Sequence, residues 1–243
     1  YEIIDRAYRP FDNLCLSVTL KAEGSIEKMV VASVVESLKV DPSDADYVRI
    51  REIFAAPSLK MASFTITEKG YNIKNADGVL FPNIVKDFEA GPDGVESYIG
   101  KVAALLYARF KAGALPISMV SMDNCSHNGS RLFDAVTTFA AEWTKRGLVE
   151  PAFNEYVNDR SKVGFPWTMI DKITPRPDAK VIEMVRADGF MDTDSVKTTK
   201  GTFVAPFVNA EETQYLVIED WFPNGHPNIA GAKGVMFADR ETV

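Results

Sequence analysis

The chain has 243 residues, of which 46% are hydrophobic and 25% are charged, so it is long enough for one large domain or two small ones. Lys and Arg number 27 against 34 Asp and Glu, which gives a formal charge of -7 without any basic stripe and argues against nucleic acid as a partner. The longest apolar run, 29–35, is far shorter than the roughly 20 residues of a membrane-spanning helix, and no secretory signal is visible, so we expect no membrane partner.

The first part of the chain predicts a hairpin, a helix and a strand. Apolar and polar residues alternate from Leu14 to Lys21, Gly24 provides a turn, and the following stretch is rich in β-branched residues, so residues 13–36 predict an antiparallel hairpin. Residues 47–55 predict a short helix that ends before Pro57. Residues 60–67 predict a buried strand.

The middle of the chain alternates between helical and strand patterns. Apolar residues recur at helical spacing from Tyr98 to Phe110, and Gly113 ends this predicted helix. Residues 117–122 predict a buried strand, and helical spacing resumes over 132–143 until Gly147. Helix, strand, polar turn and helix in this order are typical of a parallel α/β sheet.

The last part of the chain is less regular. Phe165-Pro166-Trp167 interrupts the pattern, residues 178–187 predict a helix, and residues 202–208 and 215–219 predict strands. We find no internal repeat and no low-complexity linker.

The polar segment SMDNCSHNG, residues 121–129, follows the predicted strand at 117–122. Ligands of open α/β sheets bind where strands end at their carboxyl side, so this segment is a candidate site. An Asn amide there can donate a hydrogen bond to a developing alkoxide, and Asn128-Gly129 before a helix would expose backbone N–H groups. The alternative is that Asp123, Asn124 or Ser126 only caps the following helix.

Other chemistry receives less support from the residues. Cys125 or Ser126 acting as a nucleophile with His127 is a weaker hypothesis, because adjacent residues rarely face one another and no orienting acid is evident. Asp171 either binds substrate hydroxyls or pairs with Lys172 at the surface. No G-x-G-x-x-G loop, Walker A sequence, H-E-x-x-H or C-x-x-C occurs.

Cysteine and histidine are scarce. The two cysteines, Cys15 and Cys125, lack the spacing of a zinc site, so a reducing, cytoplasmic location without zinc is expected. The two histidines, His127 and His226, are too few for a His-rich metal cluster, and His226 in its turn-forming segment is expected at the surface.

Three segments taken together resemble the polyol and sugar-acid dehydrogenases, the family that includes mannitol 2-dehydrogenase and fructuronate reductase. The segments are TITEKGY at 65–71, SMDNCSHNG at 121–129 and FPWTMIDKITP at 165–175, and the resemblance extends over essentially the whole chain. It implies a long-chain, metal-independent, NAD-dependent dehydrogenase acting on a CH–OH group. The implied fold is α/β, a Rossmann-type parallel sheet with helices on both faces and an added antiparallel hairpin, incomplete at the N-terminus.

The resemblance also implies a domain assignment. Residues 1–243 would form most of the N-terminal dinucleotide-binding domain. The family's glycine-rich loop is expected before Tyr1, and its catalytic lysine and C-terminal helical substrate domain after Val243.

Site residues follow from the same resemblance. Asn124 matches the first Asn of the family's D-N-x-x-x-N-G pattern, which gives it a catalytic role in an oxyanion hole. His226 stands where relatives have Arg in an F-P-x-G-R-P turn, so no role is carried over to that turn. The remaining implied roles are substrate binding by Asp171 and Asn128 and cofactor binding by Thr67, Glu68 and Asp123, with no metal ligand.

The implied reaction interconverts a sugar acid or polyol and its keto form by hydride transfer, with NAD as cofactor and NADP left open. A fructuronate- or mannonate-like substrate is preferred over a mannitol- or fructose-like one. The alternative is a non-catalytic nucleotide-binding relative, or an inactive fragment of such an enzyme. The expected partner is a small sugar acid or polyol, and the chain is expected to be a monomer or a weak homo-oligomer.

Overall fold

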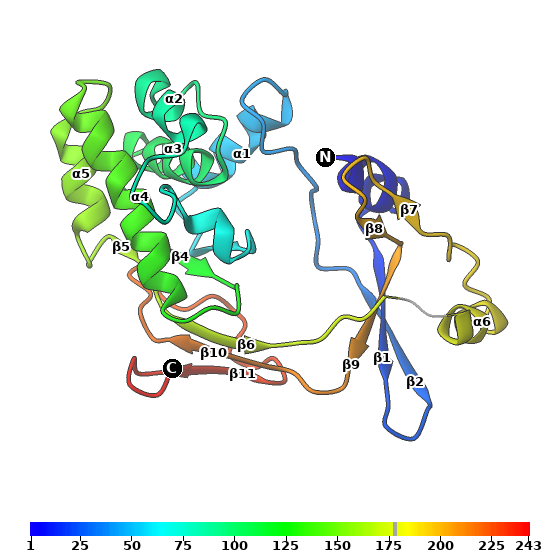
Figure 1. Ribbon diagram of the computed structural model, residues 1–243. Coiled ribbons are helices and arrows are strands. Elements are labelled where there is room, and N and C mark those ends of the chain that lie inside the picture. The colour runs from blue at the N-terminus through cyan, green and yellow to red at the C-terminus, as the bar shows by residue number, and fades with distance from the viewer. Residues whose placement is uncertain (177–178) are drawn as a thin grey trace. The chain divides into compact units, whose positions relative to one another are not determined.

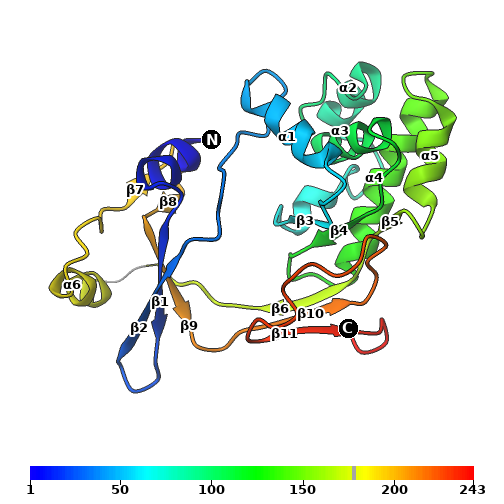
Figure 2. The same cartoon turned by 180° about the vertical axis from the view of Figure 1, so that it is seen from behind.

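The computed structural model describes residues 1–176 and 179–243, and the chain divides into two compact units (Figures 1 and 2). The first unit comprises residues 1–39 and 171–214, and the second comprises residues 40–170 and 215–243. Each unit is therefore built from segments that are distant in the sequence.

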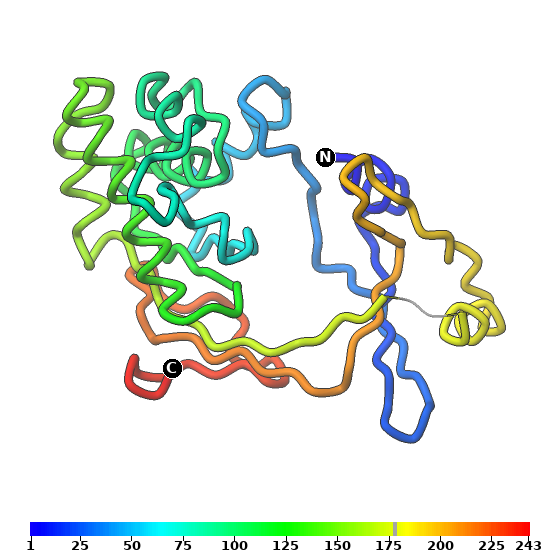
Figure 3. Tube along the Cα trace, viewed as in Figure 1, coloured from blue at the N-terminus to red at the C-terminus, as the bar shows by residue number. Residues whose placement is uncertain are grey.

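The first unit contains a three-stranded sheet with the order β2-β1-β9. Its strands are β1 (Cys15–Leu20), β2 (Ile26–Val31) and β9 (Phe207–Glu211). β1 and β2 are antiparallel and pair from Cys15 with Val31 to Leu20 with Ile26, so the predicted hairpin is confirmed with shorter strands than 13–36. β9 runs parallel to β1 although nearly 200 residues separate them, and Figure 3 shows the two side by side.

A helix covers this sheet and gives the first unit its apolar core. Val18 of β1 is buried against Val181 and Val185 of α6 (Ala179–Ala187) and Phe207 of β9. The predicted helix at 178–187 is thus observed from Ala179, while Asp178 lies outside the described residues. The remaining elements of this unit are short: η1 (Ile4–Tyr8), η2 (Arg9–Phe11), β7 (Val196–Lys197) and β8 (Phe203–Val204).

The predicted strand at 202–208 is wrong as a single element. It is split into β8, which pairs with β7, and β9, which pairs with β1. Pro206 lies between them, and proline lacks the N–H that a continuous ladder needs.

The second unit contains a parallel sheet with the order β3-β4-β5. Its strands are β3 (Met61–Phe64), β4 (Ile117–Ser121) and β5 (Val163–Gly164). Parallel neighbours need crossover connections. Here α3 (Tyr98–Lys111) joins β3 to β4, while α4 (Asn128–Lys145) and α5 (Pro151–Asn158) join β4 to β5. The predicted alternation of helix and strand is confirmed, and every residue of β4 is buried.

Later segments of the chain form another three-stranded sheet, with the order β11-β10-β6. Its members are β6 (Thr168–Asp171), β10 (Tyr215–Glu219) and β11 (Val235–Ala238), with β10 and β11 parallel. The predicted strand at 215–219 is confirmed as β10, whereas β11 has no counterpart among the sequence predictions.

Three of the helices of the second unit, α1 (Asp46–Ala55), α3 and α4, were predicted, and two were missed. α1 confirms the helix predicted at 47–55. α2 (Pro82–Ala90) and α5 are only two turns long, so each shows too few apolar repeats to stand out as a helix. Tertiary packing stabilises α2: Phe88 meets Phe139 of α4 edge to face with the ring centroids 4.8 Å apart, and the Trp143 indole N–H donates to the Asp87 carbonyl at 3.0 Å.

A buried arginine fixes the start of the two strands that lead to the site. Arg109 of α3 is 0% exposed, and no carboxylate within residues 1–176 and 179–243 forms an ion pair with it. Its guanidinium donates instead to five backbone carbonyls, those of Phe54, Ala56, Leu59, Leu115 and Pro116, at 2.6–3.0 Å. These carbonyls precede β3 and β4, so one side chain sets where both strands begin.

Candidate active site at the ends of two parallel strands

The candidate site lies where β3 and β4 end. Phe64 pairs with Ser121 at the last position of the two strands, and the Met122 N–H donates to the Phe64 carbonyl at 2.8 Å. The segments that follow, 65–71 and 122–129, therefore leave the sheet next to each other. The predicted strand at 60–67 ends earlier than expected, at Phe64, and is half-buried rather than buried.

Asp123 joins these two segments. Its carboxylate is 7% exposed and accepts hydrogen bonds from the Ile66 N–H at 2.9 Å, the Thr67 N–H at 3.0 Å and the Tyr71 hydroxyl at 2.5 Å. Ser121 Oγ lies 2.7 Å from the same hydroxyl. Burial raises the pKa of Tyr71, and its hydrogen bond to Asp123 raises it further, so the phenol stays protonated.

Two non-glycine residues beside this carboxylate have positive φ. Thr67 has φ 63° and ψ 159°, a region that is essentially restricted to glycine, and His127 is left-handed with φ 54°. Each such conformation costs about 1–3 kcal/mol and persists only where surrounding contacts impose it. The strain thus lies in the two segments that follow the carboxyl ends of β3 and β4.

Asn124 is the exposed amide of the polar segment. Within the described residues no hydrogen bond to its side chain is formed, so its N–H and C=O groups face solvent. Asn124 follows a buried strand and the hydrogen-bonded Asp123, so an exposed side chain stands on a restrained backbone. An amide donor in this place can bind a substrate oxygen.

Asn128 behaves differently from the expectation. It is 1% exposed, and its amide N–H groups donate to the Asp123 carbonyl at 3.0 Å and to Thr168 O and Oγ1 at 3.0 and 2.8 Å. Its oxygen accepts from the Thr168 N–H at 3.0 Å and the Gly129 N–H at 2.7 Å. The structure therefore corrects two expectations: the Asn128 side chain is used within the protein rather than open to substrate, and the Gly129 N–H is not free.

The capping alternative for the polar segment is also wrong. α4 begins at Asn128 with His127 as its N-cap, and no side chain caps it. Asp123 turns instead towards the segment after β3, and the His127 ring packs on the Trp167 indole with the centroids 4.4 Å apart.

Glu68 faces α4. Its carboxylate lies 3.1 Å from Arg131 Nη1, and the same guanidinium donates through Nε to the Ser126 carbonyl at 3.0 Å. Glu68 and Thr67 are both exposed, so both are accessible from solvent as a cofactor-binding role requires.

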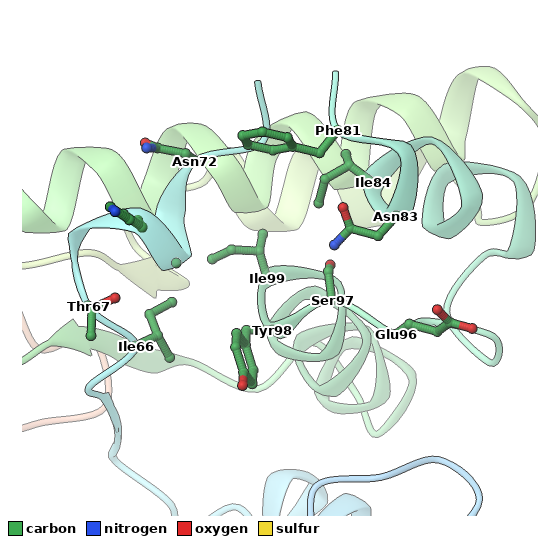
Figure 4. Close-up of a pocket in the computed structure, with 12 residues that line it drawn as sticks. Ile66, Thr67, Asn72, Phe81, Asn83, Ile84, Glu96, Ser97, Tyr98 and Ile99 are labelled. Atoms are coloured by element: carbon green, nitrogen blue, oxygen red, sulfur yellow. The ribbon is translucent and has the colours of Figure 1, made fainter. Parts of the chain in front are cut away.

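A pocket of about 390 Å³ adjoins Thr67, and Figure 4 shows its lining side chains, with Ile99 near the centre and Asn83 beside Ser97. The segment after β3 forms one wall, and α2 with the start of α3 forms the others. The lining residues are Ile66, Thr67, Lys69, Gly70, Asn72, Phe81, Asn83, Ile84, Glu96, Ser97, Tyr98 and Ile99.

The nucleophile hypothesis receives no support from the geometry. Burial raises the pKa of the Cys125 thiol, which disfavours the reactive thiolate. In the described part of the chain, no hydrogen bond links His127 to Cys125 or Ser126, and no three His, Cys, Asp or Glu side chains gather closely enough to bind a metal ion.

Asp171 belongs to the first unit, at the last position of β6, and is partly exposed. The alternative in which it pairs with Lys172 is not observed. The Lys172 ammonium donates to the Glu211 carbonyl at 2.6 Å and to Gln214 Oε1 at 2.9 Å.

His226 is exposed, as expected, and its ring packs on a residue of β11. Its ring stacks on Phe237 with the centroids 4.4 Å apart, and Nε2 lies 2.5 Å from Asp220 Oδ1.

Sequence reasoning missed the residues that hold the site together: Tyr71, Ser121, Thr168 and Arg131. Tyr71 lay within a segment that had been singled out, but no local pattern indicates that its hydroxyl contacts a residue 52 positions away. Contacts of this range are set by the strand register.

The chain is similar to a protein-family model and to several known dehydrogenases and oxidoreductases. A family model described as the mannitol dehydrogenase Rossmann domain matches residues 12–231. The chain is 51% identical over 244 residues to the D-mannonate oxidoreductase of Thermotoga maritima, covering 100% of this chain and 45% of that protein. It is 32% identical to the mannitol 2-dehydrogenase of Cereibacter sphaeroides, covering 89% of this chain and 40% of that protein.

A solved structure agrees with these similarities. The Pseudomonas fluorescens mannitol 2-dehydrogenase, in a ternary complex with NAD and D-mannitol, matches with a TM-score of 0.73 and 27% identity over 95% of this chain and 43% of that chain. The Rossmann-type fold expected from the sequence is confirmed. The chain spans less than half the length of these relatives. None of the helices in its described part has the length and hydropathy needed to cross a bilayer.

Proposed function

Because the chain belongs to the mannitol dehydrogenase family, we propose that it is the dinucleotide-binding part of an NAD-dependent dehydrogenase that interconverts a sugar acid or polyol and its keto form. The observation that carries this proposal is the exposed Asn124 amide, held at the end of the buried strand β4 in the family's D-N-x-x-x-N-G pattern. The polar segment thus has one amide available to a ligand and one, Asn128, that fixes the loop.

We assign a sugar acid of the mannonate and fructuronate type as the preferred substrate. The support is the 51% identity to a D-mannonate oxidoreductase over the whole chain, against 32% to a mannitol 2-dehydrogenase. A polyol of the mannitol type is the second candidate, supported by the second similarity.

The residues present fit a dinucleotide. Dinucleotides bind at the carboxyl ends of parallel strands, and here the ends of β3 and β4 present exposed Thr67 and Glu68 beside a pocket of about 390 Å³. Thr67 and Glu68 would hold the cofactor, which when bound supplies the hydride donor or acceptor. NAD is preferred over NADP because the mannitol 2-dehydrogenase of similar structure was solved with NAD.

The chain's own residues have separate tasks in this proposal. Asn124 donates an amide N–H to the substrate oxygen, where negative charge develops as the carbonyl and hydroxyl forms interconvert. Asp171 accepts hydrogen bonds from substrate hydroxyls. The proton on the substrate oxygen is assigned to a lysine outside residues 1–243. We also propose a reducing, cytoplasmic location, which the two free cysteines support. The proposed oligomeric state is a monomer or a weak homo-oligomer.

A substrate panel tests the function. The complete protein that contains this chain is assayed for NAD+ reduction with mannonate, altronate, mannitol and arabinitol, and for NADH oxidation with fructuronate. We expect the highest kcat/KM for a sugar acid, and a repeat with NADP+ tests the cofactor preference. A polyol preference would contradict the substrate assignment, and inactivity with every compound would contradict the function.

The role of Asn124 has its own test. We expect Asn124→Ala to lower kcat by roughly 10²-fold or more, the usual loss when one oxyanion donor is removed. Ser126→Ala, an exposed change in the same loop, is the matched control and should leave kcat unchanged. Equal activity of Asn124→Ala and the parent would reject the assignment.

A further inference from the structure

The Asp123 carboxylate accepts a hydrogen bond from the Thr67 backbone N–H. The roles expected above for the two side chains in ligand binding do not account for this hydrogen bond. We propose that Asp123 is a positioning residue: its carboxylate holds Thr67 and the loop of Asn124 in the conformation that the ligands meet, and it is not itself a cofactor ligand. The effect on ligand binding rests on the proposed function, whereas the effect on loop conformation does not.

The hydrogen bonds of Asp123 leave little for a ligand. Oδ1 accepts from the Thr67 N–H, and Oδ2 accepts from both the Ile66 N–H and the Tyr71 hydroxyl. With the side chain 7% exposed, the carboxylate is enclosed by groups of its own chain. Its charge is directed at the backbone after β3, and the positioning role proposed here takes the place of the cofactor-binding role expected from the resemblance.

Thr67 needs such a partner. It is β-branched and has φ 63° and ψ 159°, which a threonine does not adopt unless other contacts impose it. Its N–H is fixed by Asp123 Oδ1, and the next residue begins the 3-10 helix η3 (Glu68–Tyr71), whose last residue returns to Oδ2. Asp123 therefore holds both ends of the turn that begins with Thr67.

The same residue fixes the loop of Asn124 through its backbone. The Asp123 carbonyl accepts from the Cys125 N–H at 2.9 Å and from the Asn128 amide at 3.0 Å, so the chain on both sides of Asn124 is restrained. One residue thus couples the two exposed groups, Thr67 and Asn124, that the proposed function places against the ligands.

Asp123→Asn tests the coupling with almost no change in shape. The Asn side chain has one acceptor oxygen and one NH2 group, which is a donor. Either the Ile66 N–H or the Thr67 N–H must therefore face the NH2 group and lose its acceptor. Tyr71→Phe is the matched control, because it removes one donor to Asp123 and leaves both backbone hydrogen bonds in place.

The loop conformation is measured by thiol alkylation with iodoacetamide and peptide mass spectrometry. Cys125 lies within the Asn124 loop, and Cys15 in the other unit is an internal reference. We expect Asp123→Asn to raise the alkylation rate of Cys125 relative to Cys15 by roughly fivefold or more, because the loop opens locally. Tyr71→Phe should change the ratio much less. An unchanged ratio in Asp123→Asn would overturn the proposal.

NADH binding to the complete protein distinguishes positioning from direct contact. We expect Asp123→Asn to raise the Kd for NADH roughly tenfold, since small misplacements at a binding site have large effects. In a Thr67→Gly background, where positive φ is unstrained, the same change should raise Kd by less than about threefold. An equal loss in both backgrounds would mean that Asp123 contacts the cofactor and would overturn the proposal.

The outcomes separate the two claims. If the parent protein does not bind NADH, the proposed cofactor fails, while the alkylation ratio still decides whether Asp123 positions the loop. If Asp123→Asn alone does not fold, the double variant with Thr67→Gly decides instead. Recovery of folded protein supports action through Thr67, and failure to recover contradicts it.

Discussion

Arg109 provides a test of how the start of the two site strands is fixed. The perturbation is Arg109→Met, which keeps the aliphatic length of the side chain and removes the guanidinium. Five carbonyl oxygens ahead of β3 and β4 then lose the guanidinium as a donor. Those of Leu115, Leu59 and Ala56 keep a second donor, whereas within the described residues no other donor reaches the carbonyls of Phe54 and Pro116. Arg109→Lys is the graded variant, because an ammonium offers three N–H donors and cannot replace all five hydrogen bonds of the guanidinium.

The magnitude follows from the hydrogen bonds. A buried acceptor left without a partner costs about 1–3 kcal/mol, but losses within one network do not simply add. Removing the desolvation of the buried cation offsets part of the total. With two carbonyls left without a partner and three further hydrogen bonds lost, we expect Arg109→Met to lower the free energy of unfolding by about 3 kcal/mol or more, and Arg109→Lys by about 1 kcal/mol or more. Domains have only about 5–15 kcal/mol in total, so the methionine variant loses a large fraction of its stability.

Urea unfolding followed by tryptophan fluorescence measures these changes, because Trp143 is fully buried in the same unit as Arg109. The control is Arg51→Met. Arg51 forms an exposed ion pair with Asp93 at 3.4 Å, and its loss should change stability by no more than about 0.5 kcal/mol. If Arg109→Met lies within about 1 kcal/mol of the parent, the five carbonyls do not depend on the guanidinium and the reasoning is refuted.

Two further predictions concern packing and pH. Gly129→Ala should destabilise the protein by several kcal/mol, about 3 or more, because a Cβ would lie 2.5 Å from the backbone oxygen of Pro166; Gly231→Ala, with open space around it, should be neutral in the same urea assay. Hydrogen bonds from the Lys111 ammonium and then the Tyr107 hydroxyl lower the pKa of Glu150 to about 2. Solvent screens these exposed contacts, so they contribute only a small stabilisation, which is present above the unfolded pKa near 4.5 and is lost as the pH falls towards 2. Unfolding measured from pH 6 to pH 2 should therefore show a smaller loss in Glu150→Gln than in the parent, and parallel curves would contradict the link.

The sequence by itself determined the elements whose signal is local. Alternation over 14–21 and helical spacing from Tyr98 to Phe110 were enough to locate β1 and α3, because side-chain burial repeats within each element. The same periodicity placed the polar segment after a buried strand, where an open sheet binds ligands. The family resemblance singled out Asn124, which the structure leaves exposed at that strand end.

Tertiary structure alone decided which polar groups of the segment are available. Asp123 and Asn124 are adjacent and similar in size and polarity, yet the first is enclosed and the second is exposed. The difference arises because the register of β3 against β4 brings the Thr67 N–H within reach of Asp123, 56 positions later. Asn128 is likewise engaged by Thr168, 40 residues away. No local pattern encodes these partners, because they exist only once the parallel strands have paired.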